Sequence, residues 1–244
     1  TGSAVANGFL NVDGIHVYVL YPKGKVSPIQ ECQFTTLGNN ITAIEVDGVF
    51  DDCQSLVKSA FMDDELNKHM KLTSANSINV ARFLPQSFYY FYAYASLVKK
   101  GKITCGDKVN FVVPTGNFGN ILAAYYAKNM GIPIAKLICA SNENKVLYDF
   151  FQTGTYDKNR EFVLTTSPSM DILISSNLER LIYKITGNDA EKNAEFMKAL
   201  TTEGKYEITG EMKAQLEDFY GNYATEAETA DVIKEVYTKA DYVL

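Results

Sequence analysis

The sequence predicts an α/β protein built on a doubly wound parallel sheet, with a helical extension at its carboxyl end. Two observations lead to this prediction. Over residues 1–140, short β-branched and aromatic runs alternate with helical stretches, an order typical of parallel strands joined by right-handed crossovers. Over residues 141–244, strand-like runs become few and amphipathic helical stretches follow one another. We therefore expect a parallel α/β region over 1–140 and a mainly helical continuation of the same domain over 141–244.

The first elements are marked by strand-like composition and by helix-start signals. The β-branched and aromatic run Ile15–Tyr21 is stopped by Pro22, which favours a buried strand. Ser27 followed by Pro28 marks a helix start, because serine caps a helix and proline fits its first position. The elements expected here are helices over 2–9, 28–38 and 51–61 and strands over 15–21 and 40–46.

A long helix with one interruption is expected next. Residues 77–98 have a helical pattern, and Pro85 removes a backbone donor inside it, so we expect a kink there. Beyond it the pattern predicts strands over 107–113 and 134–140, a helix over 117–130, and further helices over 145–152, 176–185, 190–200, 211–220 and 226–239.

The composition is that of an ordinary globular protein. Apolar residues make up 46% of the chain and charged residues 21%, which is enough apolar material for a substantial core. The formal net charge is -6 and the pI is about 5.1, values that argue against a nucleic-acid partner. No apolar run is long enough to cross a membrane, and the start does not resemble a signal peptide. These features favour a cytosolic enzyme that acts on a small molecule.

The cysteines and histidines do not suggest a metal site. The four cysteines have no CxxC spacing, and the two histidines lie in unrelated surroundings. We expect no bound metal and interpret the thiols as reduced, mostly buried groups of a cytosolic protein. These residues are Cys32, Cys53, Cys105, Cys139, His16 and His69.

The strongest local signal is the segment Pro114-Thr115-Gly116-Asn117-Phe118-Gly119-Asn120, where a hydrophobic strand ends, a glycine-rich turn follows and a helix begins. Unpaired backbone N–H groups at a helix N-terminus bind phosphate well, and glycines let the backbone approach the anion closely. In an open parallel sheet, ligands bind at the carboxyl ends of strands, where this segment is expected. It matches neither a Walker A motif nor the pattern Gly-x-Gly-x-x-Gly. The segment predicts a phosphate-binding loop, with a plain helix-capping turn as the alternative.

A second polar cluster lies in the segment Leu72–Arg82, at the start of the long helix. The chain has only three arginines, so an arginine within a polar motif is notable. Asn79 and Arg82 share one helix face, and a guanidinium group matches the oxygens of a phosphate. The cluster predicts a second anion site, with capping of the helix by its serines and asparagines as the alternative.

Together these segments resemble the threonine synthase family, pyridoxal 5′-phosphate (PLP) enzymes of fold type II, and the resemblance runs in order along essentially the whole chain. The loop Thr115–Asn120 alone fits several fold-type-II enzymes. The stretches Ser74–Asn79 and Ser167–Leu173 are more characteristic of threonine synthases. Further matching segments are Thr1-Gly2-Ser3-Ala4, Tyr21–Pro28 and Ser175–Arg180.

The resemblance implies a lyase of threonine biosynthesis in the cytosol, which converts O-phospho-L-homoserine and water to L-threonine and phosphate with PLP as cofactor. It implies that the loop backbone, with the Thr115 side chain, holds the cofactor phosphate: Thr115, Gly116, Asn117, Phe118, Gly119 and Asn120. It also implies that the substrate phosphate is held by Thr1, Asn76, Ser77 and Arg82. A phosphorylated substrate on a phosphorylated cofactor requires two phosphate sites, in agreement with the two predicted anion sites. The oligomeric state is left open.

One family feature is missing from the sequence. In the family, the Schiff-base lysine lies upstream of a Ser-Gly-Asp-Thr-Gly motif, and this chain begins with the Thr1-Gly2 of that motif. No lysine here has the family's Phe-Lys-Asp context, so no catalytic residue is assigned. We expect an internal fragment that is inactive alone, whereas the intact parent is active. The alternatives are another fold-type-II PLP lyase, related to threonine dehydratase or cysteine synthase, and a non-catalytic scaffold that binds a phosphorylated ligand.

Overall fold

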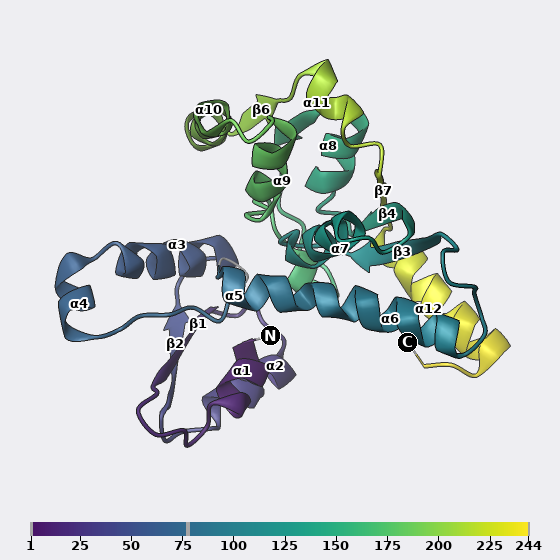
Figure 1. Ribbon diagram of the computed structural model, residues 1–244. Coiled ribbons are helices and arrows are strands. Elements are labelled where there is room, and N and C mark those ends of the chain that lie inside the picture. The colour runs from purple at the N-terminus through teal and green to yellow at the C-terminus, as the bar shows by residue number, and fades with distance from the viewer. Residues whose placement is uncertain (1, 77–78, 244) are drawn as a thin grey trace. The chain divides into compact units, whose positions relative to one another are not determined.

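The computed structural model describes residues 2–76 and 79–243. The chain divides into two compact units, Thr1–Arg82 and Phe83–Leu244, and each is described by itself. Figure 1 follows the elements in order along the chain.

The first unit is built on two parallel strands, β1 (Val17–Pro22) and β2 (Ile41–Val46), paired in register from Val17 opposite Ile41. Helix α2 (Pro28–Thr35) connects them. It begins where the sequence predicts, because the Ser27 hydroxyl accepts from the Gln30 N–H at 3.2 Å and proline occupies the first turn. The remaining helices of this unit are α1 (Gly2–Gly8), α3 (Phe50–Phe61), α4 (Asp64–His69) and the start of α5 (Val80–Phe83).

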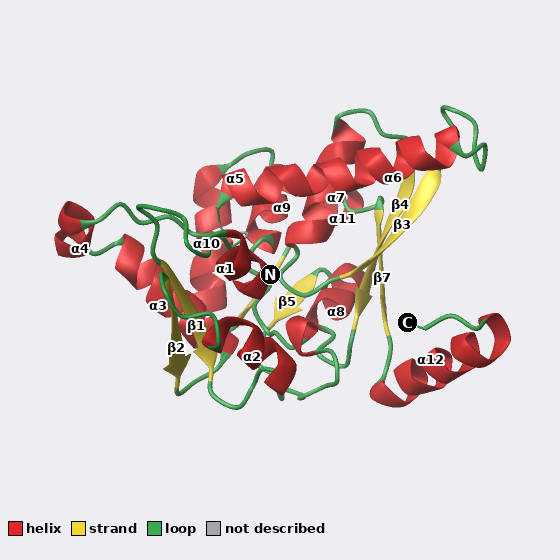
Figure 2. Cartoon of the chain, turned by 90° about the horizontal axis from the view of Figure 1, so that it is seen from below, coloured by secondary structure: helices red, strands yellow, loops and turns green. Residues whose placement is uncertain are grey.

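The second unit contains a parallel sheet of three strands. They are β3 (Val109–Pro114), β4 (Ile134–Ser141) and β7 (Phe219–Tyr223), in the order β3-β4-β7. Helix α7 (Gly119–Asn129) crosses from β3 to β4, and Figure 2 shows it running beside α6 (Ser87–Lys99) along this sheet. The carboxyl ends of β3 and β4 therefore meet at one edge, where ligands bind in sheets of this kind.

The core of the second unit lies between α7, the sheet and the helices that follow it. Ile121, Leu122 and Leu137 are completely buried there. A short antiparallel pair, β5 (Thr155–Asp157) and β6 (Lys205–Glu207), adds Tyr156 and Tyr206 to the same core. The other elements are α8 (Val146–Thr153), α9 (Leu178–Ile185), α10 (Ala190–Thr202), α11 (Gly210–Ala214), α12 (Glu226–Ala240) and the 3₁₀ turns η1 (Leu84–Gln86) and η2 (Pro168–Met170).

The predicted α/β class with parallel strands is confirmed. One predicted element was wrong, and the short strands β5 and β6 were not predicted. The helix expected over 211–220 is a short helix, α11, followed by the strand β7. Pairing with β4 decides its conformation, because a parallel partner outweighs local helix propensity. The break expected at Pro85 is present as η1. The division at residue 140 was based on the kinds of elements expected on either side, and it stays a prediction. In the structure, the boundary between the two compact units falls after Arg82.

Among the described residues, no helix is both long and apolar enough to span a membrane.

Candidate anion-binding site

The predicted phosphate loop leaves the sheet at Thr115, which is nearly completely buried. Its backbone N–H donates to the Ala140 carbonyl at 2.9 Å, and its hydroxyl donates to the Val113 carbonyl at 2.6 Å. Both of its donors are therefore used inside the sheet. Beside it, burial raises the pKa of the Cys139 thiol to about 12, against a smaller lowering effect of the Thr115 and Ser141 hydroxyls. The thiol stays neutral at physiological pH and brings no negative charge to the site.

The next five residues leave their backbone donors unused. Among the hydrogen bonds within 2–76 and 79–243, none uses the backbone N–H of these residues. The first hydrogen bond of α7 runs from the Leu122 N–H to the Phe118 carbonyl at 3.1 Å. The unused N–H groups thus coincide with the positive end of the helix dipole, and a buried one is costly without a partner. The five residues are Gly116, Asn117, Phe118, Gly119 and Asn120.

Phe118 turns the chain from strand into helix in a strained conformation. It has φ 64° and ψ -4°, the left-handed region, although it is not glycine. Its ring is completely buried, with centroids 5.9 Å from Phe219 and 6.2 Å from Phe151. Aromatic packing therefore holds a backbone geometry that would otherwise relax, and this geometry aligns the unused N–H groups.

Asn120 closes the loop rather than extending toward solvent. Its side-chain Nδ2 donates to the Pro114 carbonyl at 2.7 Å, and its Oδ1 accepts from the Ile121 N–H at 2.9 Å. Its carbonyl accepts from the Tyr90 hydroxyl at 2.7 Å. Burial raises the pKa of Tyr90 to about 12, so this hydroxyl remains a donor over the physiological range.

Three polar residues from a distant part of the chain hold the loop, and we call Ser175–Asn177 the brace. The Ser175 hydroxyl donates to the Gly116 carbonyl. The Ser176 N–H and hydroxyl both donate to Asn117 Oδ1 at 2.7 Å. Asn177 donates to the Asn117 carbonyl, from its backbone N–H at 3.3 Å and from Nδ2 at 3.0 Å. The brace thus occupies the carbonyl oxygens of Gly116 and Asn117 and the side-chain oxygen of Asn117, whereas the backbone N–H groups of both residues stay unused within the described part of the chain.

A second segment, η2, packs against the loop at Gly116. A Cβ at Gly116 would lie 2.7 Å from the Ser169 carbonyl oxygen and 3.3 Å from the Met170 Cα. The backbone of the loop approaches η2 more closely than any other residue type allows. Glycine at this position is therefore a packing requirement as well as a loop signal.

The second candidate cluster lies in the first unit. Its described part is organised by Asn79, whose Nδ2 donates to the Ser74 carbonyl at 2.8 Å and whose Oδ1 accepts from the Ala81 N–H at 2.9 Å. The Asn76 N–H donates to the Ser74 hydroxyl at 3.1 Å, and the Arg82 N–H donates to the Asn79 carbonyl at 3.1 Å. Asn76 and Arg82 are thus both hydrogen-bonded to Asn79 through the backbone, and Arg82 lies within α5. We call this group of residues the polar turn.

The other predicted site residues are placed as follows. Thr1 and Ser77 lie outside the described residues. Asn76 and Arg82 belong to the first unit, whereas the loop Thr115–Asn120 belongs to the second. The structure brings the loop together with the brace and η2, which the sequence marked as characteristic segments without assigning them a role.

The arrangement is suited to binding an anion rather than to moving protons. The loop Thr115–Asn120 has no ionisable side chain. Its donors are backbone N–H groups fixed by the brace, which suits a phosphate that must be positioned but not chemically changed.

Known proteins resemble the chain along its whole length. Threonine synthase of Schizosaccharomyces pombe is 41% identical over 266 residues, which covers 100% of this chain and 51% of that protein. The chain belongs to the threonine synthase family. A crystal structure of PLP-bound threonine synthase from Brucella melitensis matches with a TM-score of 0.87 and 41% identity, covering 100% of this chain and 52% of that one.

The chain is also similar to a human protein with a different name. Human threonine synthase-like 1 is 41% identical over 258 residues, covering 100% of this chain and 35% of that protein. No family model matches the chain. The chain spans about half the length of the fungal threonine synthase that it matches.

Proposed function

We propose that this chain is part of a PLP-dependent threonine synthase, in which the loop Gly116–Asn120 binds the phosphate of the cofactor. The observation that supports this most is the run of five unused backbone N–H groups at the start of α7. The proposed reaction converts O-phospho-L-homoserine and water to L-threonine and phosphate. The small-molecule substrate and the cytosolic location expected from composition belong to the same proposal.

Several features of the loop fit the phosphate of PLP. Consecutive N–H groups at a helix N-terminus match the several oxygens of a phosphate dianion. The missing Cβ of Gly116 lets η2 close on the loop, and the brace fixes the loop from its carbonyl side. Thr115 supports the loop from within the sheet, because both of its donors are already used there. When bound, PLP would supply the electron sink for chemistry at the amino acid's α-carbon.

The substrate phosphate is assigned to the polar turn of the first unit. Arg82 offers a guanidinium group whose planar fork matches two phosphate oxygens. Asn76 is linked to the same polar turn, because its carbonyl accepts from the Asn79 N–H at 3.0 Å, and Thr1 and Ser77 complete the proposed set. These residues would bind and orient the leaving phosphate group, while the loop of the second unit would hold the cofactor.

We also propose that the 244 residues alone do not catalyse the reaction. No lysine among them lies in the Phe-Lys-Asp context of the family. A chain without the amine of the Schiff-base lysine cannot form the covalent bond to the cofactor. We therefore expect a total loss of activity rather than a reduced rate.

The test is phosphate release from O-phospho-L-homoserine by the parent protein with PLP, beside the 244-residue chain. Threonine and phosphate in equal amounts from the parent alone would support both proposals. A folded, PLP-loaded parent that releases no phosphate would overturn the assignment. Deamination of threonine, or release of an acyl group from an O-acylserine, would then point to the alternative lyases. Failure to bind PLP at all would point to a non-catalytic scaffold.

A further inference from the structure

We propose that Tyr156 and Asp171 are positioning residues for the phosphate loop, acting through the two segments that pack against it. Neither side chain belongs to the loop or to the polar turn of Arg82. The proposal rests on the proposed function of the loop as the site for the PLP phosphate. Tyr156 would act through the brace, and Asp171 would act through η2.

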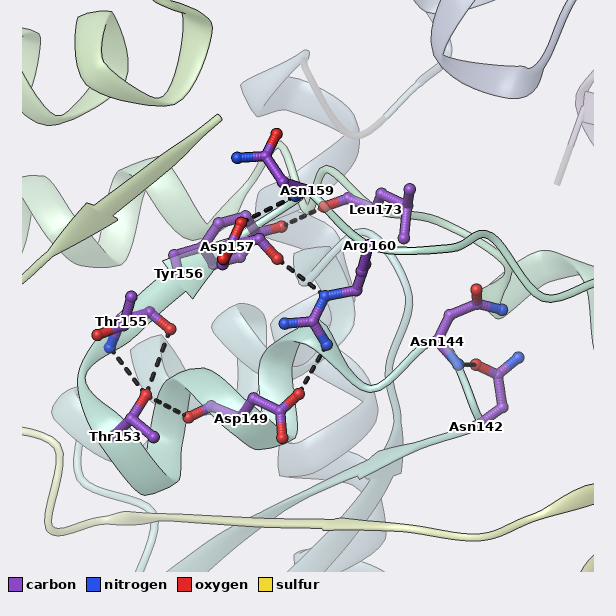
Figure 3. Close-up of polar contacts among 10 residues, drawn as sticks. All are labelled: Asn142, Asn144, Asp149, Thr153, Thr155, Tyr156, Asp157, Asn159, Arg160 and Leu173. Atoms are coloured by element: carbon purple, nitrogen blue, oxygen red, sulfur yellow. Dashed lines mark hydrogen bonds and ion pairs between the residues drawn. The ribbon is translucent and has the colours of Figure 1, made fainter. Parts of the chain in front are cut away.

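The Tyr156 hydroxyl makes a hydrogen-bonded bridge between two backbone groups just before the brace. It donates to the Leu173 carbonyl at 2.9 Å and accepts from the Ser175 N–H at 2.7 Å. Figure 3 shows the first of these bonds, with Tyr156 on β5 and Leu173 on the neighbouring segment. The side chain is almost fully buried, with 1% of its surface exposed. In such surroundings both backbone groups depend on the hydroxyl for a partner.

Ser175, the residue that Tyr156 fixes, contacts the loop directly. Ser175, whose N–H is held by Tyr156, donates its hydroxyl to the Gly116 carbonyl. Ser176 and Asn177 follow at once and bind Asn117. One side chain therefore fixes the start of the segment that orients two consecutive residues of the loop.

Asp171 fixes the other segment, directly after η2. Its Oδ1 accepts from Asn142 Nδ2 at 2.7 Å, from Asn144 Nδ2 at 3.0 Å and from the Thr165 hydroxyl at 2.7 Å. Its Oδ2 accepts from the Thr165 N–H at 2.9 Å. All four residues are buried, so a carboxylate surrounded by neutral donors ties η2 to the end of β4. This is the segment whose backbone approaches Gly116.

Packing and positioning can be separated at Tyr156. Its ring stacks on Tyr206 with centroids 5.5 Å apart and planes 5° apart, and this contact needs no hydroxyl. Beyond β5, Arg160 holds the chain by donating to the Asp157 carbonyl at 2.9 Å and to Asp149 at 2.6 Å, as Figure 3 shows. The Tyr156→Phe substitution therefore removes the bridge and leaves the ring and the neighbouring anchors in place.

The experiment compares the affinity of the parent protein for PLP with its affinity for pyridoxal, which lacks the phosphate. We expect Tyr156→Phe to weaken PLP binding about tenfold, the factor that corresponds to about 1.4 kcal/mol. Pyridoxal binding should stay within about twofold, because the loop contributes little to it. Asp171→Asn should show the same selective loss, because its amide N–H groups would face donors.

Tyr206→Phe is the matched control. Its hydroxyl takes no part in the hydrogen bonds of the described residues, and it should leave both affinities unchanged. An equal loss of PLP and pyridoxal in Tyr156→Phe, or no loss of either, would overturn the positioning role while leaving the proposed function intact. A wild-type parent that does not bind PLP would instead overturn the proposed function. The ³¹P resonance of bound PLP gives a second readout, since a displaced loop should shift it in Tyr156→Phe and not in Tyr206→Phe.

Discussion

At Gly116 a single absent methyl group sets how closely the loop and η2 can approach. Alanine there would place its Cβ 2.7 Å from the Ser169 carbonyl oxygen, and that atom is backbone and has little freedom to move. We expect Gly116→Ala to lower the free energy of unfolding by about 1–3 kcal/mol, the usual cost of overpacking, and to weaken PLP binding. Chemical denaturation and a PLP titration check this.

Gly210→Ala is the control for that substitution, because a Cβ at Gly210 would meet no atom within 4 Å. It should be close to neutral in both measurements. If Gly116→Ala also left both the stability and the PLP affinity unchanged, the loop would not pack closely against η2 as described.

Arg82 is the residue on which the assignment of the substrate depends. Losing a charge-assisted, forked hydrogen bond to phosphate costs about 1.5–3 kcal/mol. We expect Arg82→Ala in the parent to lower kcat/KM for O-phospho-L-homoserine by about 10- to 150-fold, while the affinity for PLP is unchanged. Arg82→Lys should recover part of the loss, because the charge returns without the fork. A lower affinity for PLP in either variant would show that Arg82 contacts the phosphate of the cofactor and not that of the substrate.

At the scale of single elements, the start of α12 predicts a local response to pH. Thr225 and Glu228 form a reciprocal cap, with the Thr225 N–H donating to Glu228 Oε2 at 2.8 Å and the Glu228 N–H donating to the Thr225 hydroxyl at 3.2 Å. Hydrogen bonds from the backbone and then the side chain of Thr225 lower the pKa of Glu228. The cap is therefore fully present above the ordinary glutamate pKa and is lost as pH falls through the lowered value.

Amide exchange at the first turn of α12 should rise as pH falls through that window, after correction for the intrinsic pH dependence of exchange. In Glu228→Gln the protection should be weaker and independent of pH over the same range. An unchanged pH response in Glu228→Gln would show that another group controls the turn.

The strands of the parallel region were predictable because their apolar runs are short and clearly bounded. Predicted strands at 15–21 and 134–140 correspond to Val17–Pro22 and Ile134–Ser141. The strand at residues 219–223 was not predictable, because its conformation depends on pairing with β4, which is far away in sequence. The short pair β5 and β6 was missed for the same reason.

The candidate site was predictable only where it is local. The loop carries its own signal, since a strand, a glycine-rich turn and a helix start follow one another. The left-handed backbone of Phe118 had no such signal, because it is imposed by rings from α8 and β7. The bridge from Tyr156 to Ser175 spans 19 residues and joins a side chain to backbone, so no spacing rule marks it.

At the scale of the whole molecule, the position of Cys139 predicts slow thiol chemistry. Cys139 lies on β4 between β3 and β7 and is completely buried, whereas Cys105 is exposed. Since burial raises the pKa of Cys139 to about 12, its thiolate is scarce at pH 8. We expect a thiol reagent to modify Cys105 rapidly and Cys139 only after unfolding, as peptide mass mapping would show.

The raised pKa also has a consequence for stability. Because the folded state holds the Cys139 thiol neutral, burial of this group makes its full contribution to the free energy of unfolding at pH values below the ordinary thiol pKa. It is lost as pH rises toward 12. Fast modification of Cys139 in native protein at pH 8 would mean that the sheet opens locally.

The order β3-β4-β7 has a consequence for the growing chain on the ribosome. Ser141 pairs with Tyr223, about 80 residues later. At translation rates of about 5–20 residues per second, β4 emerges roughly 4–16 s before its neighbour has been synthesised. Until β7 arrives, one edge of β4 presents unpaired N–H and C=O groups to other nascent chains. During this interval the open edge of β4 is a place where another chain can pair, so anything that covers it would favour correct assembly of the sheet.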